Sequence, residues 1–191
     1  MAQLKTHGNK KRLSKRDPVT LEIYQNLITT TETRLIRSNN YTTARLRVTL
    51  CLLTITGINV SQLLPLKVHQ VKTLLEEGWI KIYCSKRRSA SHKAYLSNQG
   101  KHLLKSRQKD FDLLFFLKKE TSYIFSSQLD HNKPIRREQI TKDVNKIMAL
   151  VSKNLPDQPN LKSYSFCISD DITQLWRDSK DIKLIKQTIG H

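Results

Sequence analysis

The sequence contains few acidic residues for its size. Of its 191 residues, 34 are Lys or Arg and only 16 are Asp or Glu, so the formal net charge is +18. A chain with this imbalance repels itself unless a polyanion offsets the charge. Nucleic acid is a natural polyanionic partner, because Lys and Arg contacts release the counterions condensed on phosphates. The charge therefore favours a nucleic-acid partner.

Long apolar runs are also missing. No stretch of about 18 consecutive apolar residues is present, as a membrane-spanning helix would need, and no apolar segment follows the basic N-terminus. We therefore expect a soluble protein without a secretion signal and without a membrane partner. A hydrophobic content of 38% over this length suffices for one core and is too little for two full domains.

Cysteine and glycine are scarce. The three cysteines, Cys51, Cys84 and Cys167, are widely spaced and form no CxxC or Cys/His cluster. This argues against a disulfide framework and a zinc site, so we expect a reducing compartment and no metal. Only five Gly occur, while Lys, Ile, Leu, Asn, Ser and Thr are abundant. This leaning toward AT-rich codons predicts an organellar genome, with the chloroplast preferred over the mitochondrion.

The first 17 residues are polar, strongly basic and without apolar periodicity. We interpret them as a flexible arm, either solvated or in contact with phosphates, that precedes one globular domain over residues 18–191. The domain is expected to begin with an amphipathic helix from residue 18 to about 38, because Pro18 suits a helix start and Leu21, Tyr24, Ile28 and Leu35 recur at helical spacing.

Residues 42–57 are apolar almost all round and end in Gly57, a pattern typical of a buried central helix with a glycine cap. Ser61 is expected to cap a short helix that stops near Pro65. The two helices then meet at a tight turn that contains Asn59.

Between residues 78 and 96 the period changes to two, since Ile80 and Ile82 alternate with polar neighbours. This predicts a β-hairpin with a long tip. Because cations crowded on one tip repel each other, we favour DNA contact there over a merely solvated loop. The tip and its flanks carry Lys86, Arg87, Arg88, His92 and Lys93.

Further helices are predicted at about 98–119, 137–153, 171–178 and 181–189. We expect the last of them to have an Asp cap and to pack Ile182, Ile185 and Ile189 inward. The whole pattern predicts a mainly α fold with a small antiparallel β-hairpin, of the α+β class.

Four short motifs resemble those of the tyrosine recombinase catalytic domain, the phage integrase family, and in particular integrase-like reading frames of algal organelle genomes. The resemblance covers residues 19–191. In that family a buried helix ends in TG before an Arg and a short SELL-like helix, a hairpin carries a catalytic Lys, and an HSFR box precedes a Gly-His pair. The matching stretches here are TGINVSQLL, CSKRR, YSFC and IGH.

The resemblance implies phosphodiester strand transfer without metal or cofactor. A Tyr hydroxyl attacks the phosphate, and two Arg hold the charge that develops on the non-bridging oxygens. A hairpin Lys protonates the departing oxygen, and His groups donate hydrogen bonds.

This sequence departs from the pattern at its centre. Lys86 and His191 match catalytic positions, whereas the two Arg positions hold Asn59 and Cys167, and the His position of the HSFR box holds Tyr164. The family's nucleophilic Tyr follows the Gly-His pair, and the sequence given stops at His191. Loss of one transition-state donor costs about a hundredfold to a thousandfold in rate. We therefore expect a degenerate, C-terminally truncated relative that binds duplex DNA and does not cleave it.

Two alternatives remain open. In the first, the chain is a fragment of an active site-specific recombinase. In the second, it is a basic RNA-associated or structural protein. Arg45 and Arg47, which open the buried helix, are further candidates for DNA contact, with solvent-facing positions as the alternative. We expect a monomer in the absence of DNA.

Overall fold

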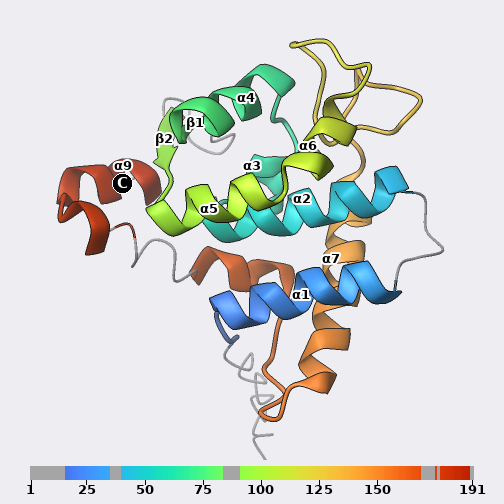
Figure 1. The fold of residues 1–191 in the computed structure, drawn as a ribbon, viewed down its shortest axis with the longest axis vertical. Helices are drawn as coiled ribbons and strands as arrows, with labels where there is room; N and C mark the ends of the chain where they lie inside the picture. Colours follow the sequence, from blue (N-terminus) through green and yellow to red (C-terminus); the bar gives the residue numbers. More distant parts are fainter. Residues whose placement is uncertain (1–15, 35–39, 84–90, 169–174, 176, 190–191) are drawn as a thin grey trace, which may run out of the picture.

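A computed structural model describes residues 16–34, 40–83, 91–168, 175 and 177–189. These residues form a helical domain with one two-stranded sheet, as expected (Figure 1). The elements are α1 (Leu21–Arg34), α2 (Asn40–Thr56), α3 (Val60–Leu63), α4 (Val68–Glu77), β1 (Trp79–Tyr83), β2 (Ser91–Tyr95), α5 (Asn98–Ser106), α6 (Gln108–Phe115), α7 (Arg137–Asn154), the 3-10 helix η1 (Ser163–Ile168) and α9 (Ile182–Ile189).

Helix α2 is the centre of the core, as its all-round apolar sequence predicts. Thirteen of its 17 residues are buried, and it lies between α1 on one side and α5 and α6 on the other (Figure 1). Three of its buried threonines, Thr49, Thr54 and Thr56, donate their hydroxyls to carbonyls one turn back in the helix. Thr54, for example, donates to the Leu50 carbonyl at 2.8 Å. The helix ends at Gly57, whose φ of 63° suits glycine.

Helix α1 begins later than predicted, at Leu21 instead of Pro18. The cause is local, because the Thr20 hydroxyl oxygen accepts from the Ile23 N–H at 3.2 Å and so caps the helix. Tyr24, Leu27 and Ile28 are buried, on a helix that packs against α2 and α7.

The turn after α2 corrects one prediction and adds a helix. Asn59, not Ser61, is the N-cap of α3, and it forms a capping box with Gln62. Helix α4, which the sequence analysis did not predict, follows directly. It buries Val71 and Leu74 and ends at Gly78, where φ is 77°. A Cβ at Gly78 would lie 2.8 Å from Lys101 Cε.

The hairpin is confirmed, with Ile80 opposite Ala94 and Ile82 opposite His92. Ile80 and Ile82 are buried, whereas Lys81 and Lys93 are exposed, which is the predicted alternation. The tip, residues 84–90, lies outside the described residues.

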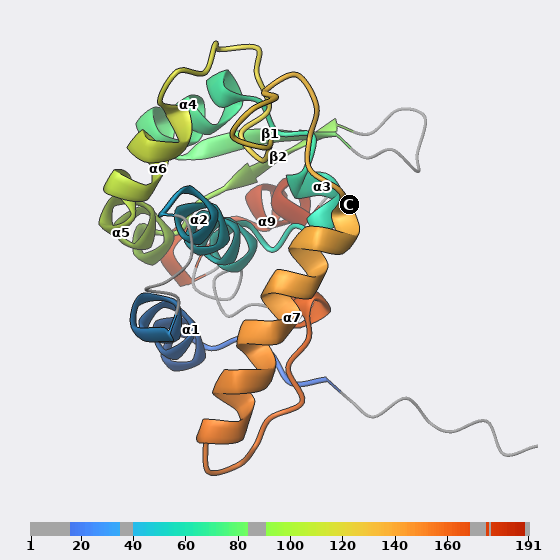
Figure 2. The same ribbon diagram turned by 90° about the vertical axis from the view of Figure 1, so that its right-hand side faces the viewer.

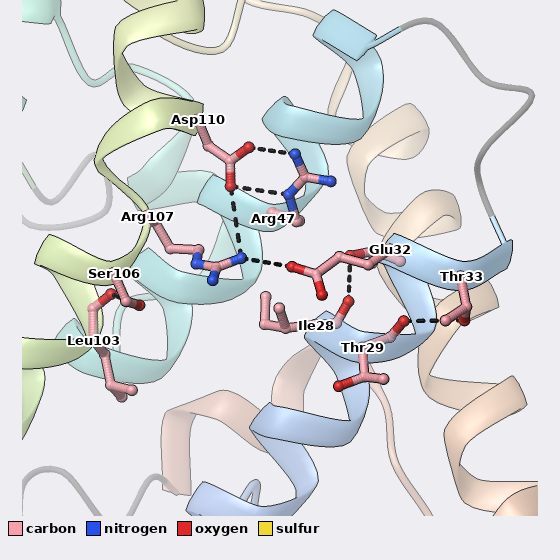
Figure 3. A network of polar contacts seen from close by, with 10 residues as sticks. Ile28, Thr29, Glu32, Thr33, Arg47, Leu103, Ser106, Arg107 and Asp110 are labelled. Carbon is pink, nitrogen blue, oxygen red and sulfur yellow. Dashed lines mark hydrogen bonds and ion pairs between the residues drawn. The ribbon is translucent and has the colours of Figure 1, made fainter.

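The single helix predicted at about 98–119 is wrong. The helix is interrupted at Arg107, which lies between α5 and α6 and has a φ of −104° and a ψ of 13°. The break has a tertiary cause, since the Arg107 guanidinium donates to Glu32 of α1 at 3.1 Å and lies 3.8 Å from the Asp110 carboxylate (Figure 3).

Helix α7 has the predicted extent and buries Ile140, Val144, Ile147, Met148 and Val151 along one face. No helix within the described residues is long and apolar enough to cross a membrane.

The C-terminal helix α9 has the predicted Asp cap and lies against β2. Asp181 Oδ1 accepts from the N–H groups of Lys183 at 2.7 Å and Leu184 at 3.3 Å. The inward packing of Ile182 is a wrong prediction, because this side chain is 60% exposed. The Ile189 side chain and residues 171–174 lie outside the described part of the chain.

Candidate nucleic-acid interface

Several of the motif positions share one side of the molecule. In Figure 2, α3, the open end of the β1–β2 hairpin and the start of the described chain at Arg16 all lie toward the right of the view. Helices α5 and α6 lie toward the left. We call the first side the interface face and define it by Arg16, Asn59, η1 and the hairpin end.

Asn59 occupies the first arginine position of the resemblance, directly after α2. Its Oδ1 accepts from the N–H groups of Ser61 at 2.9 Å and Gln62 at 3.2 Å. The Gln62 side chain accepts from the Asn59 N–H at 3.1 Å in return. The side chain at this position is therefore neutral and committed to capping α3.

The second arginine position belongs to η1. Ser165 and Phe166 are fully buried, whereas Tyr164 is 57% exposed. The start of the turn is fixed by the Ser163 N–H, which donates to Asn145 Oδ1 of α7 at 2.8 Å. Cys167 is part of η1, but its side chain lies outside the description.

The chain start lies beside η1, a contact that sequence reasoning missed. The Arg16 guanidinium carbon is 5.6 Å from the centre of the Tyr164 ring. Asp17 and Asn160 hold this segment in place, because the Asp17 N–H donates to the Asn160 carbonyl at 3.3 Å and Asp17 Oδ2 accepts from the Asn160 N–H at 2.7 Å. Arg16 and Asp17 are the last residues of the predicted arm.

The hairpin contributes Lys93, whose Nζ lies 4.0 Å from the centre of the Trp79 ring. This cation–π contact holds an exposed cation on the hairpin. The backbone of His92 is in β2, opposite Ile82. The predicted positions Lys86, Arg87, Arg88 and His191 and the side chain of His92 lie outside the described residues, and their roles stay predictions.

Arg45 lies near a second cation, Lys118, and has no carboxylate within ion-pair distance in the described part of the chain, although the charge of Asp143 acts on it from farther away. It donates from Nη1 to the Ser126 carbonyl at 3.2 Å and lies 5.9 Å from the centre of the Tyr41 ring. Lys118 lies 5.5 Å from the same ring and donates to the carbonyls of Tyr123 at 3.0 Å and Ile124 at 2.6 Å. Burial lowers the pKa of Arg45, and burial together with Arg45 lowers the pKa of Lys118 to about 8.

Arg47 points into a different environment. It donates to both carboxylate oxygens of Asp110, from Nε at 2.9 Å and from Nη2 (Figure 3). The hydrogen bonds that Arg47 donates to Asp110 raise the pKa of Arg47. Because its donors are committed to Asp110, Arg47 contributes less to any phosphate contact than its charge suggests. A cavity of about 450 Å³ lined by residues of α1, α2 and α6 adjoins this pair.

Within the described ranges, no three His, Cys, Asp or Glu side chains come together as a metal site would require.

Comparison with known proteins places this geometry in a family. No curated protein matches the sequence. The fold is similar to the crystal structure of XerA recombinase, with a TM-score of 0.63 and 20% identity over 93% of this chain and 57% of that one. It is also similar to the XerH site-specific recombinase bound to difH substrate.

The post-cleavage complex of XerH, with palindromic difH, has a TM-score of 0.59 and 18% identity, over 92% of this chain and 46% of that one. The pre-cleavage complex has a TM-score of 0.59 and 19% identity, over 92% and 48%. The chain thus spans about half the length of these proteins. The model of the phage integrase family matches residues 19–191, and the chain therefore belongs to the phage integrase family.

Proposed function

We propose that this chain is a DNA-binding domain of the phage integrase family that holds duplex DNA on its interface face and does not cleave it. The observation that carries the proposal is the state of Asn59. At the position where the family has a phosphate-binding Arg, the side chain is uncharged and caps α3 through two hydrogen bonds. Scaffold and charge are kept, whereas a central transition-state donor is missing.

The binding half of the proposal is supported by the charge distribution. The chain carries a net charge of +18. Arg16, on the interface face, and Lys93, on the hairpin, are exposed and have no carboxylate within ion-pair distance among the described residues. Such cations gain free energy by displacing condensed counterions from DNA. The similarity of the fold to XerH, which was crystallised bound to its difH substrate, supports the same partner.

The inactive half is supported by chemistry at two positions. Strand transfer needs guanidinium groups that hold the charge of the phosphorane-like state. Asn59 and Cys167 occupy both family positions, and neither side chain is cationic. Because loss of each donor costs about a hundredfold to a thousandfold in rate, the double replacement predicts a cleavage rate below detection.

Binding is tested by fluorescence anisotropy with a labelled random-sequence duplex at several salt concentrations, with a structured RNA hairpin of equal length as the competing ligand. We expect duplex binding that weakens with salt at a slope steeper than about −3, which corresponds to at least three or four phosphate contacts. Clear preference for the RNA, or a slope near zero, would refute the proposed DNA-binding function.

Cleavage is tested with a pool of nicked duplexes of randomised sequence, because a nick traps any covalent protein–DNA adduct. We expect no adduct from this chain, with XerH and its difH substrate as the positive control. A covalent adduct through any Tyr of this chain would contradict the proposed inactivity and leave the DNA-binding half intact.

A further inference from the structure

The contact between Arg16 and Tyr164 joins residues 148 positions apart at the degenerate box of the phosphate site. Arg16 is exposed, and its guanidinium carbon lies 5.6 Å from the centre of the Tyr164 ring. No carboxylate of the described residues lies within ion-pair distance of Arg16. The cation is thus positioned by an aromatic ring and keeps its charge and donors for a ligand.

A second, independent set of contacts fixes the backbone next to Arg16. Asp17 and Asn160 exchange two hydrogen bonds, at 2.7 Å and 3.3 Å, and Val19 is buried with only 1% of its surface exposed. The segment is therefore anchored on both its polar and its apolar side. Arg16 is the first described residue of the chain, and the backbone that directly follows it is held by these contacts.

The geometry of η1 relates Arg16 to the missing arginine. A 3-10 helix has about three residues per turn, so residues i and i+3 lie on one face. Ser165 and Phe166 face the core, and position 164 faces outward. Position 167, where the family has an Arg and this chain has Cys167, follows Tyr164 by three residues within η1. Arg16 lies over the Tyr164 ring, at the exposed position of η1.

We propose that Arg16 supplies the phosphate-binding guanidinium at η1, in place of the arginine that the family has at position 167. The proposal rests on the proposed DNA-binding function and assigns one contact of that site. The ligand is a phosphodiester of the DNA backbone, which a guanidinium holds with two parallel N–H donors. The contact serves binding only, because Arg16 comes from a separate segment of the chain and Asn59 still lacks a positive charge.

The first test removes the charge at two matched positions. In Arg16→Gln we expect the slope of log affinity against log salt to become shallower by about 0.9, and affinity at 0.1 M salt to fall roughly fivefold, because one phosphate contact is lost. Lys105→Gln is the control, since Lys105 is also exposed, the substitution removes the same charge, and α5 lies away from the interface face (Figure 2). Its slope should change by less than about 0.3.

The second test uses Asp17→Ala, for which two explanations predict opposite changes in DNA affinity. Removal of an acidic side chain ordinarily strengthens DNA binding by a basic protein. If Asp17 positions Arg16, Asp17→Ala weakens binding instead, by about two- to threefold, and has no additional effect in the Arg16→Gln background. Tyr164→Leu, which removes the ring beneath the cation, should weaken binding by a similar factor, and thermal melts confirm that each variant is folded.

The outcomes separate this inference from the function on which it rests. If the unmodified chain shows no salt-dependent binding to duplex DNA, the proposed function fails. If the unmodified chain binds, and Arg16→Gln behaves like Lys105→Gln while Asp17→Ala binds more tightly, the role of Arg16 is overturned and DNA binding stands.

Discussion

Arg45 and Arg47 leave the same helix two residues apart and reach surroundings of opposite electrostatic character. Arg47 donates to both oxygens of Asp110, and this pairing raises its pKa. Arg45 donates to the Ser126 carbonyl and lies over the Tyr41 ring, and burial lowers its pKa. The fold pairs one arginine directly with a carboxylate and leaves the other without an ion pair, with only the more distant charge of Asp143 acting on it.

The same difference extends to the neighbours of each arginine. On the Arg47 side, Arg107 joins Glu32 and Asp110 in one network that links α1, α2 and α6 (Figure 3). On the Arg45 side, Lys118 adds a second cation, and no carboxylate lies within ion-pair distance of either in the described part of the chain. Basic composition alone therefore does not identify DNA contacts, since part of it is used in holding helices together.

The largest expected effect comes from breaking the network at Asp110. The Asp110 side chain is 10% exposed and accepts from Arg47 while it lies near Arg107. Asp110→Ala leaves the partly buried Arg47 guanidinium without its partner and removes the second carboxylate near Arg107, so we expect the free energy of unfolding to fall by about 3 kcal/mol. Urea denaturation measures the change. Asp112→Ala, at an exposed position two residues on, is the control, with a loss below about 0.5 kcal/mol; equal losses would contradict the role of the network.

The next largest effect is expected at Asn59. The sequence predicts Ser61 as the N-cap of α3, whereas the structure has Asn59 there. Asn59→Ala should cost about 1 kcal/mol of stability, because Oδ1 caps two N–H groups, whereas Ser61→Ala should cost only a few tenths of that. Thermal unfolding of both variants measures the difference. A larger loss in Ser61→Ala would restore Ser61 as the functional cap.

Asn59→Arg tests whether position 59 can contribute to DNA binding. It should lose about as much stability as Asn59→Ala, because the cap is removed, and yet bind duplex DNA roughly fivefold more tightly at 0.1 M salt, since a cation is added on the interface face. Fluorescence anisotropy at several salt concentrations detects the gain. Unchanged affinity would mean that position 59 does not face the DNA backbone.

Elements with a strong local signal could be predicted from the sequence. The all-round apolar helix α2 and the alternation of Ile80 and Ile82 were recognised because burial repeats in them at a fixed period. Helix α4 was missed because its N-cap is Lys67, whose N–H is accepted by the Gln70 side chain at 2.9 Å. No Ser, Thr, Asp or Asn marks its start.

Features that depend on distant residues could not be predicted. The break between α5 and α6 accompanies a contact of Arg107 with Glu32, 75 residues away. In the candidate site, the motifs identified positions 59, 164 and 167. The contact of Arg16 with Tyr164 could be recognised only in the structure. No local pattern distinguishes an arginine that will meet a carboxylate from one that will meet a carbonyl, so the different environments of Arg45 and Arg47 were also beyond the sequence.

Lys118, the second cation near Arg45, also predicts that the stability of the fold depends on pH. Burial lowers the pKa of Lys118 from its usual 10.5 to about 8, so between these values the unfolded state binds more protons than the folded state. The free energy of unfolding should therefore rise as the pH increases from about 8 to 9.5, relative to Lys118→Met. The difference is of the order of 1 kcal/mol after allowing for solvent screening of a partly exposed group.

Urea denaturation at pH 7.5 and 9.5 measures this dependence. Lys119→Met, which removes the exposed neighbouring lysine, is the matched control and should follow the unmodified chain at both pH values. Parallel pH profiles for the unmodified chain and Lys118→Met would show that the carbonyls of Tyr123 and Ile124 hold the lysine without disfavouring its charge.

The smallest effect is expected at Glu120, which forms an ion pair with Lys72 on the surface. Both side chains are well exposed, at 57% and 42%, so solvent screens their attraction and the pair contributes little. Glu120→Gln should change the free energy of unfolding by less than about 0.5 kcal/mol, measured by urea denaturation beside Asp110→Ala. The Glu120 carbonyl, which accepts from the His69 N–H at 3.1 Å, is untouched by this substitution. A loss comparable to that of Asp110→Ala would mean that burial does not set the strength of ion pairs in this fold, and the contrast between the surroundings of Arg45 and Arg47 would lose its physical basis.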